Sequence, residues 1–493
     1  METWTPSNAA SSSTNMTERV HEGNNGLLVM SSSRYLGRYS AEAFPRFLAL
    51  QMQTQLLPKL QPFAWNLNER PKPSPKVKGA IRSLITLDAA QHQVRSFFLL
   101  DFPASACLNL DVLLARCESH WQGHNQGLTF EAVISGLIGM AAVLGHALNA
   151  RQETCIIEHA EKILNDPAVL GEATIELLVA LVLRYLYLRA TATPQATWLV
   201  ICTTMHMAES FGLHKQYSPG AGRDQYSTSG WNDETRSLLF WLISAGNRLS
   251  SHELGRTPVV LQGVTRVFPF SASDTSTIAT FCRVAHLLPL ETNPENSEDE
   301  YNHFSESLEK ITSIRIDQPF LKLIAADVCF ILYRRIRVST NRHITKQEVQ
   351  QVVAVGREAV HAARRLVQER KPWWNILSTL FQFCCTLISM DSIDSLADLN
   401  SVITTINLVR GYYPGDDSAE AVATLNTLIG ALRQKKQSEI DCLNLGDNWE
   451  GPISAKLDAP FSTERVSSEP ILEDFQFTFE DLDWMSSDLL MGQ

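Results

Sequence analysis

The stretch that decides the fold class is ATIELLVALVLRYLYLRATATPQATWLVICTTMHMAESFGLHK, which runs from Ala173 to Lys215. Its first half is apolar nearly all round, which is typical of a helix buried in the centre of a domain. In its second half, apolar residues recur at the spacing of one helical face. These residues are Trp198, Ile201, Cys202, Met205 and Ala208. Pro194 stands at a plausible first helical position and Gly212 at a helix-ending position, so the stretch predicts an αα-hairpin.

The remaining chain has the same character, because helical periodicity dominates, strand alternation is scarce and no fixed-period repeat is visible. We therefore predict an all-α fold, an irregular helical bundle with a disordered N-terminus and an acidic C-terminal tail. The expected divisions are a disordered segment (1–28), a first helical block (29–290), an acidic loop (291–300), a second helical block (301–436), and a linker with the acidic-hydrophobic tail (437–493).

Composition limits the function classes. The 493 residues carry 42 Lys plus Arg against 53 Asp plus Glu, a net charge of −11. An acidic body does not attract the phosphates of nucleic acid. The start of the chain has neither a basic nor an apolar signal region, and Ala132–Gly145 is short for a membrane span, so a buried helix is predicted there. The nine scattered cysteines form no C-x-x-C pair, which favours a reducing compartment.

A second stretch, LLFWLISAGNRLSSHELGRTP, runs from Leu238 to Pro258 and predicts a helix that begins near Asn232. Gly246 costs about 1 kcal/mol relative to alanine in a helix interior, so we expect a close approach of another helix there. Gly255 fits the left-handed position that ends a helix. Arg248 and Arg256 are interpreted as clamps between helices rather than as a phosphate site, because no glycine-rich phosphate loop precedes them.

These residues resemble the fungal-specific transcription factor domain, the middle homology region of fungal zinc-cluster regulators. The positions that match the family's helix are Arg236, Leu239, Phe240, Trp241, Arg248, Ser251, Gly255 and Arg256. Those that match its upstream tract are Ala208, Gly212, Leu213, His214 and Lys215. Asn247 stands where the family usually has Asp, so a clamp there would depend on a neutral amide. Thr257 stands where the family has Pro.

The resemblance extends over about residues 30–435, because RYLGRYS (34–40) is similar to the family's entry segment and KPWWNILSTLFQFCCTLISM (371–390) to a later helix. Family members usually begin with six cysteines that bind two zinc ions and place a helix in the DNA major groove. This sequence has no cysteine before Cys107 and no basic run before Arg70. Direct DNA binding through that module is therefore not expected, and a DNA-binding partner protein is.

The C-terminal residues 469–493 alternate acidic and apolar side chains. Repulsion between the acids would keep the apolar groups exposed, so that they could dock as a helix in a groove of a coactivator or of the transcription machinery. The expected contact residues are Phe475, Phe477, Phe479, Leu482, Trp484, Met485, Leu489 and Leu490. The alternative is a tail that folds back on its own domain.

No catalytic, metal-binding or cofactor-binding residues are predicted. His206 with Glu209, and His252 with Glu253, could bind a metal only with further ligands, and surface or satisfied histidines are the preferred interpretation. No H-E-x-x-H or G-x-S-x-G motif occurs. The basic stretch RPKPSPKVKG (70–79) is either a nuclear localisation signal or a solvated loop.

The resemblance and the tail together predict a nuclear transcription regulator, an activator of a fungal and, by analogy, specialised-metabolite gene set, with no enzymatic activity, no cofactor and no membrane contact. The alternative is a helical ligand-sensing or scaffold protein, or an uncharacterised enzyme, with a borrowed domain.

Overall fold

The computed structural model describes most of the chain between residues 20 and 444. The described residues are 20–23, 26–29, 34–37, 40–53, 74–145, 148–172, 174–192, 194–216, 231–290, 297–339, 344–413 and 415–444. The chain divides after Leu432 into two units. The predicted tail contacts from Phe475 to Leu490 lie outside the described residues, as do Arg70 and Lys72.

A small antiparallel sheet opens the described part. Strands β1 (Val20–Gly23), β2 (Gly26–Val29) and β3 (Arg34–Gly37) pair in the order β1-β2-β3, and helix α1 (Phe44–Gln51) follows. This differs from the expectation of disorder through residue 28. The residues between the paired Gly23 and Gly26 are two asparagines, which two-residue hairpin loops favour, and Leu27 is fully buried.

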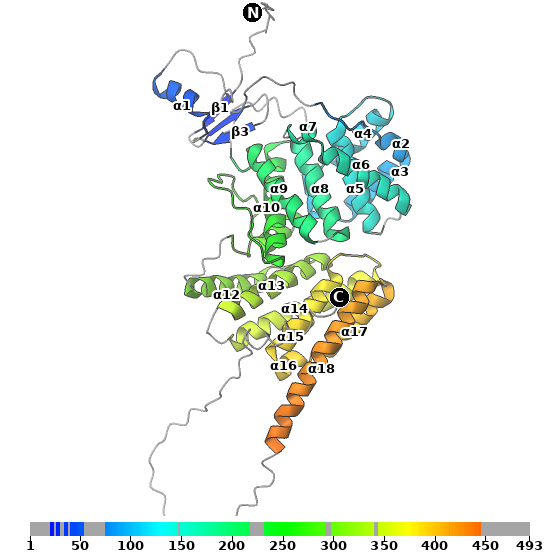
Figure 1. Cartoon of the computed structure of the whole chain (residues 1–493), viewed down its shortest axis with the longest axis vertical. Coiled ribbons are helices and arrows are strands. Elements are labelled where there is room, and N and C mark those ends of the chain that lie inside the picture. The colour runs from blue at the N-terminus through cyan, green and yellow to red at the C-terminus, as the bar shows by residue number, and fades with distance from the viewer. Residues whose placement is uncertain are drawn as a thin grey trace, which may run out of the picture. The chain divides into compact units, whose positions relative to one another are not determined.

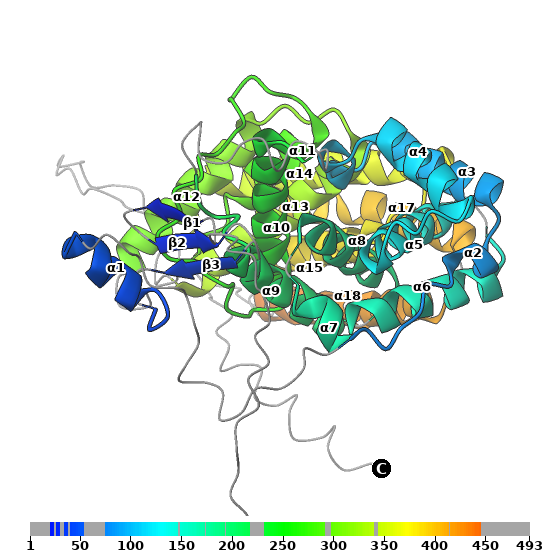
Figure 2. The same ribbon diagram turned by 90° about the horizontal axis from the view of Figure 1, so that it is seen from above.

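The first group of helices surrounds α5, which is buried on nearly all sides, as predicted for the apolar stretch from Ala132 to Gly145. Figure 2 shows α5 among α3, α6 and α8. A Cβ atom built on Gly136 would lie 2.7 Å from Cβ of Leu183, so this glycine allows α5 and α8 to approach closely. The bounds are α2 (Ile81–Leu84), α3 (Leu87–Leu99), η1 (Pro103–Cys107), α4 (Leu110–Trp121), α5 (Leu128–Val143), α6 (Ala150–Leu164), α7 (Pro167–Leu170), α8 (Ile175–Thr191), α9 (Pro194–Ser210), α10 (Asp233–Glu253) and α11 (Thr277–Ala285).

The second group of helices packs against the first through one continuous apolar core, which reaches from Ile81 to Leu425. Figure 1 shows α12 and α13 below α9 and α10. A capping box at Thr345 and Glu348 begins α14, and the rings of Phe330 and Phe383 stack with centroids 5.4 Å apart. The bounds are α12 (Ser297–Ser313), α13 (Pro319–Ser339), α14 (Lys346–Gln368), α15 (Ile376–Met390), α16 (Ile393–Leu396), α17 (Leu399–Tyr412) and α18 (Asp416–Asn444).

The all-α fold is thus confirmed, but two expected boundaries are shifted. Helix α12 begins at Ser297, inside the stretch expected to be an acidic loop. Helix α18 continues to Asn444, past the expected end at residue 436. None of the helices in the described part of the chain is long and apolar enough to span a bilayer.

Candidate functional site

The end of α9 carries the Gly212-Leu213-His214 motif. Gly212 has a φ of +71°, its N–H donates to the carbonyl of Glu209 (2.8 Å), and the N–H of Leu213 donates to the carbonyl of Ala208 (2.9 Å). These two bonds form a Schellman end, for which glycine is the favoured residue. The motif turns the chain sharply, so that His214, 1% exposed, is buried beneath the sheet with its ring edge-on to Tyr35 at 4.9 Å.

Arg266 binds the backbone of this turn, and the sequence analysis did not predict this role. Its side chain is fully buried, and its Nε and Nη2 donate to the carbonyls of Leu213 (2.6 Å) and Lys215 (2.7 Å). Nη1 lies 3.2 Å from Oδ1 of Asp233 in the first turn of α10. One guanidinium therefore joins the end of α9 to the start of α10. The sequence carries no signal for it, because its partners are about 30 to 50 residues away.

Helix α10 confirms the two predictions made for its glycines. A Cβ atom on Gly246 would lie 3.1 Å from the Tyr185 ring of α8 and 3.3 Å from the Ile201 side chain of α9, so this position is where three helices meet. Gly255 has a φ of +61° and follows the last turn of α10, as expected for a left-handed helix end.

Side chains of α10 bind the backbone of the segment that follows it. Asn247 is 1% exposed, and its amide donates to the carbonyl of Val259 (3.0 Å) and accepts from the N–H of the same residue (3.3 Å). The indole of Trp241 donates to the carbonyl of Val267 (2.9 Å). The neutral amide of Asn247 therefore holds the loop that follows α10. Phe240 is 2% exposed and lies in the core.

Two further side chains of α10 contact backbone carbonyls in the segment that follows α11. Nη1 of Arg248 donates to the carbonyl of Leu288 (2.6 Å), and burial lowers the pKa of this guanidinium to about 10. Nε2 of His252 lies 2.6 Å from the carbonyl oxygen of Pro289, and burial lowers the pKa of this imidazole to about 4. A neutral His252 can donate this bond without carrying a buried charge.

Arg256, interpreted from the sequence as a clamp between helices, contacts α9 through an aromatic ring. Its guanidinium lies 4.6 Å from the centroid of the Trp198 ring, and its Nη1 is buried without a hydrogen-bond partner. The Schellman turn at Gly255 carries the arginine back toward α9, where it makes this cation–π contact. The indole of Trp198 itself donates to Oγ of Ser251 (3.1 Å), which ties α9 to α10.

A buried carboxylate, Glu131 on α5, forms the densest ionisable cluster we find in the described residues. Its Oε2 accepts from Nε2 of His159 (2.6 Å) and from the N–H groups of Ala80 (2.9 Å) and Ile81 (3.1 Å). Nε2 of His120 lies 3.1 Å from its other oxygen. Burial alone would raise the pKa of Glu131, but these bonds outweigh it and the pKa is lowered. The cluster fastens the segment before α2 to the core.

The two histidine–glutamate pairs considered in the sequence analysis do not form a metal site with further ligands in the described part of the chain. His206 and Glu209 lie 3.8 Å apart and are both exposed, while His252 is bound to Pro289. Among the residues that the structure describes, no group of three or more His, Cys, Asp or Glu side chains is arranged to hold a metal ion.

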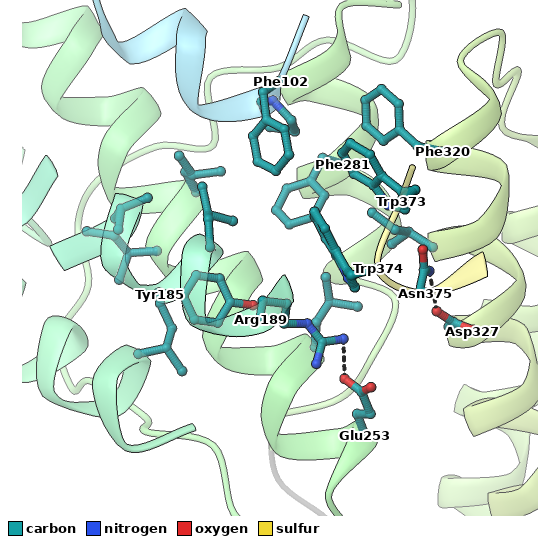
Figure 3. A pocket seen from close by; sticks show the side chains of 18 of the residues that line it. Phe102, Tyr185, Arg189, Glu253, Phe281, Phe320, Asp327, Trp373, Trp374 and Asn375 are labelled. Carbon is teal, nitrogen blue, oxygen red and sulfur yellow. Dashed lines mark hydrogen bonds and ion pairs between the residues drawn. The ribbon is translucent and has the colours of Figure 1, made fainter. Parts of the chain in front are cut away.

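A cavity lies where the two groups of helices meet (Figure 3). Ile201 and Glu253, both singled out from the sequence, line it, but neither was predicted to form a binding site. The cavity encloses about 720 Å³, counting the part that opens to solvent. The wall is mainly apolar. Arg189 and Glu253 form an ion pair on one side, and Asn375 donates a hydrogen bond to Asp327 on another. Its aromatic residues are Phe102, Tyr185, Phe281, Phe320, Trp373 and Trp374.

Comparison with known proteins gives the class. The fungal specific transcription factor domain matches residues 121–385, more than half of the chain, so the chain belongs to this family. Protein RDR1 of Saccharomyces cerevisiae is 31% identical over 422 residues, which are 84% of this chain and 75% of that protein.

Other relatives carry a role in transcription in their names. Transcription factor kojR of Aspergillus oryzae is 24% identical over 429 residues, 86% of this chain and 76% of that protein. A probable transcriptional repressor of Schizosaccharomyces pombe is 23% identical over 219 residues, 44% of this chain and 47% of that protein. No solved structure matches the chain. The protein is a transcription regulator.

Proposed function

We propose that this regulator activates a fungal gene set from the nucleus, with the helical body as its regulatory domain and the acidic tail as its contact to a coactivator or to the transcription machinery. The observation that carries the proposal is the family match over residues 121–385. The relatives include both a transcription factor and a probable repressor, so their names do not decide between activation and repression. The alternating acids and apolar residues of 469–493 favour activation. By analogy with the family, the gene set serves a specialised metabolite.

Promoter recruitment is proposed to occur through a DNA-binding partner protein. The body supports this, because the residues before Glu469 carry a net charge of −4 once the seven acids of the tail are set aside. Nuclear entry is proposed to use the basic stretch 70–79, of which Lys76 and Lys78 are exposed.

The regulator is proposed to work without catalysis of its own. Its densest ionisable cluster supports this view, because Glu131 and His120 are 2% and 1% exposed and Glu131 is held by backbone amides. Such an arrangement supports a role for these residues in fixing the fold.

A tethered reporter tests the activation proposal. The full chain is fused to a heterologous DNA-binding domain, and we expect reporter activation that is lost when residues 469–493 are deleted. A matched variant replaces Phe475, Phe477, Phe479, Leu482 and Trp484 by alanine, which keeps length and charge, and it should lose activation as well. Activation that survives both changes, or repression by the full chain, would contradict the proposal.

A second candidate function is ligand sensing by the helical body. The cavity between the two groups of helices favours it, because a molecule bound there would contact both groups.

A further inference from the structure

The cavity wall holds a hydrogen-bond acceptor, the amide oxygen of Asn375, that has no donor. Oδ2 of Asp327 accepts from Nδ2 of Asn375 at 2.7 Å. Asn375 is only 2% exposed, and its amide oxygen is buried without a hydrogen-bond partner. A buried acceptor without a donor is destabilising, because it has lost its hydrogen bonds to water. A ligand with N–H donors would remove that destabilisation.

The charges of the wall are also unbalanced. Arg189 is already paired with Glu253. Arg334, about two turns beyond Asp327 on α13, is exposed and donates to Gln382 at 2.8 Å. Among the cavity-lining residues that the structure describes, Asp327 is thus the carboxyl group without a cation bound to it.

Burial raises the pKa of Asp327 to about 7, although the hydrogen bond from Asn375 and the side chain of Thr379 act against burial. The charge of Glu253 also raises this pKa, and the charge of Arg189 lowers it. Near neutral pH the carboxyl group is therefore protonated in part of the molecules. A cation placed beside it would favour the ionised form.

Stacked aromatic side chains line the same cavity as this carboxyl group. The rings of Trp373 and Trp374 have centroids 4.2 Å apart, and Phe320 stacks on Trp373 at 4.3 Å. The indole N–H of Trp373 is buried without a partner. Aromatic side chains attract cations, more strongly where the site excludes water.

We propose that this cavity binds an apolar amine, with its ammonium group against the Asp327 carboxylate and the Asn375 amide oxygen and its apolar body among Trp373, Trp374 and Phe320. These contacts lie on α13 and just before α15, while α8 and α10 form the facing wall of the same cavity (Figure 3). The regulatory consequence rests on the proposed function, since occupancy would then change how the two groups of helices present the regulator to its partners.

Calorimetric titration of the purified full chain tests the binding site independently of any transcriptional activity. The probes share one body and differ in charge: 2-phenylethylamine, 2-phenylethanol and 3-phenylpropionate. We expect the amine to bind at least about tenfold more tightly than the alcohol, and the acid most weakly. A tie between amine and alcohol, tighter binding of the acid, or no binding of any probe at millimolar concentration overturns the proposal.

Variants separate the head group from the body. Asp327→Asn should lower amine affinity at least about tenfold and leave alcohol affinity unchanged, which also shows that the cavity is folded. Trp374→Ala should weaken amine and alcohol alike. Asp317→Asn, an exposed acid outside the cavity, should change neither. Full amine affinity in Asp327→Asn would overturn the assignment.

The pH dependence gives an independent reading of the same carboxyl group. The amine stays protonated while Asp327 ionises, so amine affinity should rise by up to about tenfold from about pH 6 to about pH 8. In Asp327→Asn this rise should vanish. A pH-independent amine affinity in the unaltered chain would contradict the proposal.

Discussion

Replacement of Arg266 by methionine tests whether one guanidinium joins α9 to α10. The side chain is fully buried and donates to the carbonyls of Leu213 and Lys215 at 2.6 and 2.7 Å. Loss of the donor for a buried carbonyl costs about 1 to 2 kcal/mol, so two of them cost about 3 kcal/mol. The Asp233 side chain is 51% exposed, and its ion pair contributes less than about 1 kcal/mol.

Urea unfolding and amide hydrogen exchange measure this cost. Arg266→Met should lower the free energy of unfolding by about 3 kcal/mol or, if the opening is local, speed exchange at Gly212 and Leu213 by up to about 150-fold. Asp233→Asn should cost less than about 1 kcal/mol, and Arg315→Met, which removes an exposed arginine, about 0.5 kcal/mol or less. The reasoning is refuted if Arg266→Met behaves like Arg315→Met, or if Asp233→Asn costs as much.

Two further predictions concern packing and pH. Gly356→Ala should destabilise the fold by about 1 to 3 kcal/mol, because its Cβ atom would overlap the Phe383 ring. The control Gly430→Ala has open space around it and should be neutral or slightly stabilising. Equal melting temperatures for the two variants would contradict this prediction. Burial lowers the pKa of His214 and of His252 to about 4, below the value of about 6.5 in the unfolded chain. The unfolded chain therefore binds more protons between about pH 6.5 and about pH 4, and urea midpoints should fall as the pH is lowered through that window, whereas constant midpoints would argue against neutral buried histidines.

Local signals made much of the α9–α10 region predictable. Pro194 begins α9 and Asn232 caps α10, as their sequence positions indicated. Gly246 and Gly255 were predictable because a mid-helix glycine and a terminal glycine each have a specific conformational use. These predictions needed no knowledge of tertiary contacts.

Features that depend on distant partners were not predictable. Arg266 bonds to carbonyls about 50 residues earlier, and Arg256 contacts the ring of Trp198 on α9. The cavity combines residues from Phe102 to Asn375, so no single stretch of sequence indicates it. The short strands β1 to β3 escaped because four-residue strands give too little alternation to detect.

The central claim is that the chain regulates transcription at promoters, and chromatin immunoprecipitation of the tagged full chain in its native host tests it most directly. The account predicts that the chain is enriched at promoters of a defined gene set whose transcripts fall when residues 469–493 are removed. Absence of promoter enrichment, together with unchanged transcripts in cells that lack the chain, would contradict it.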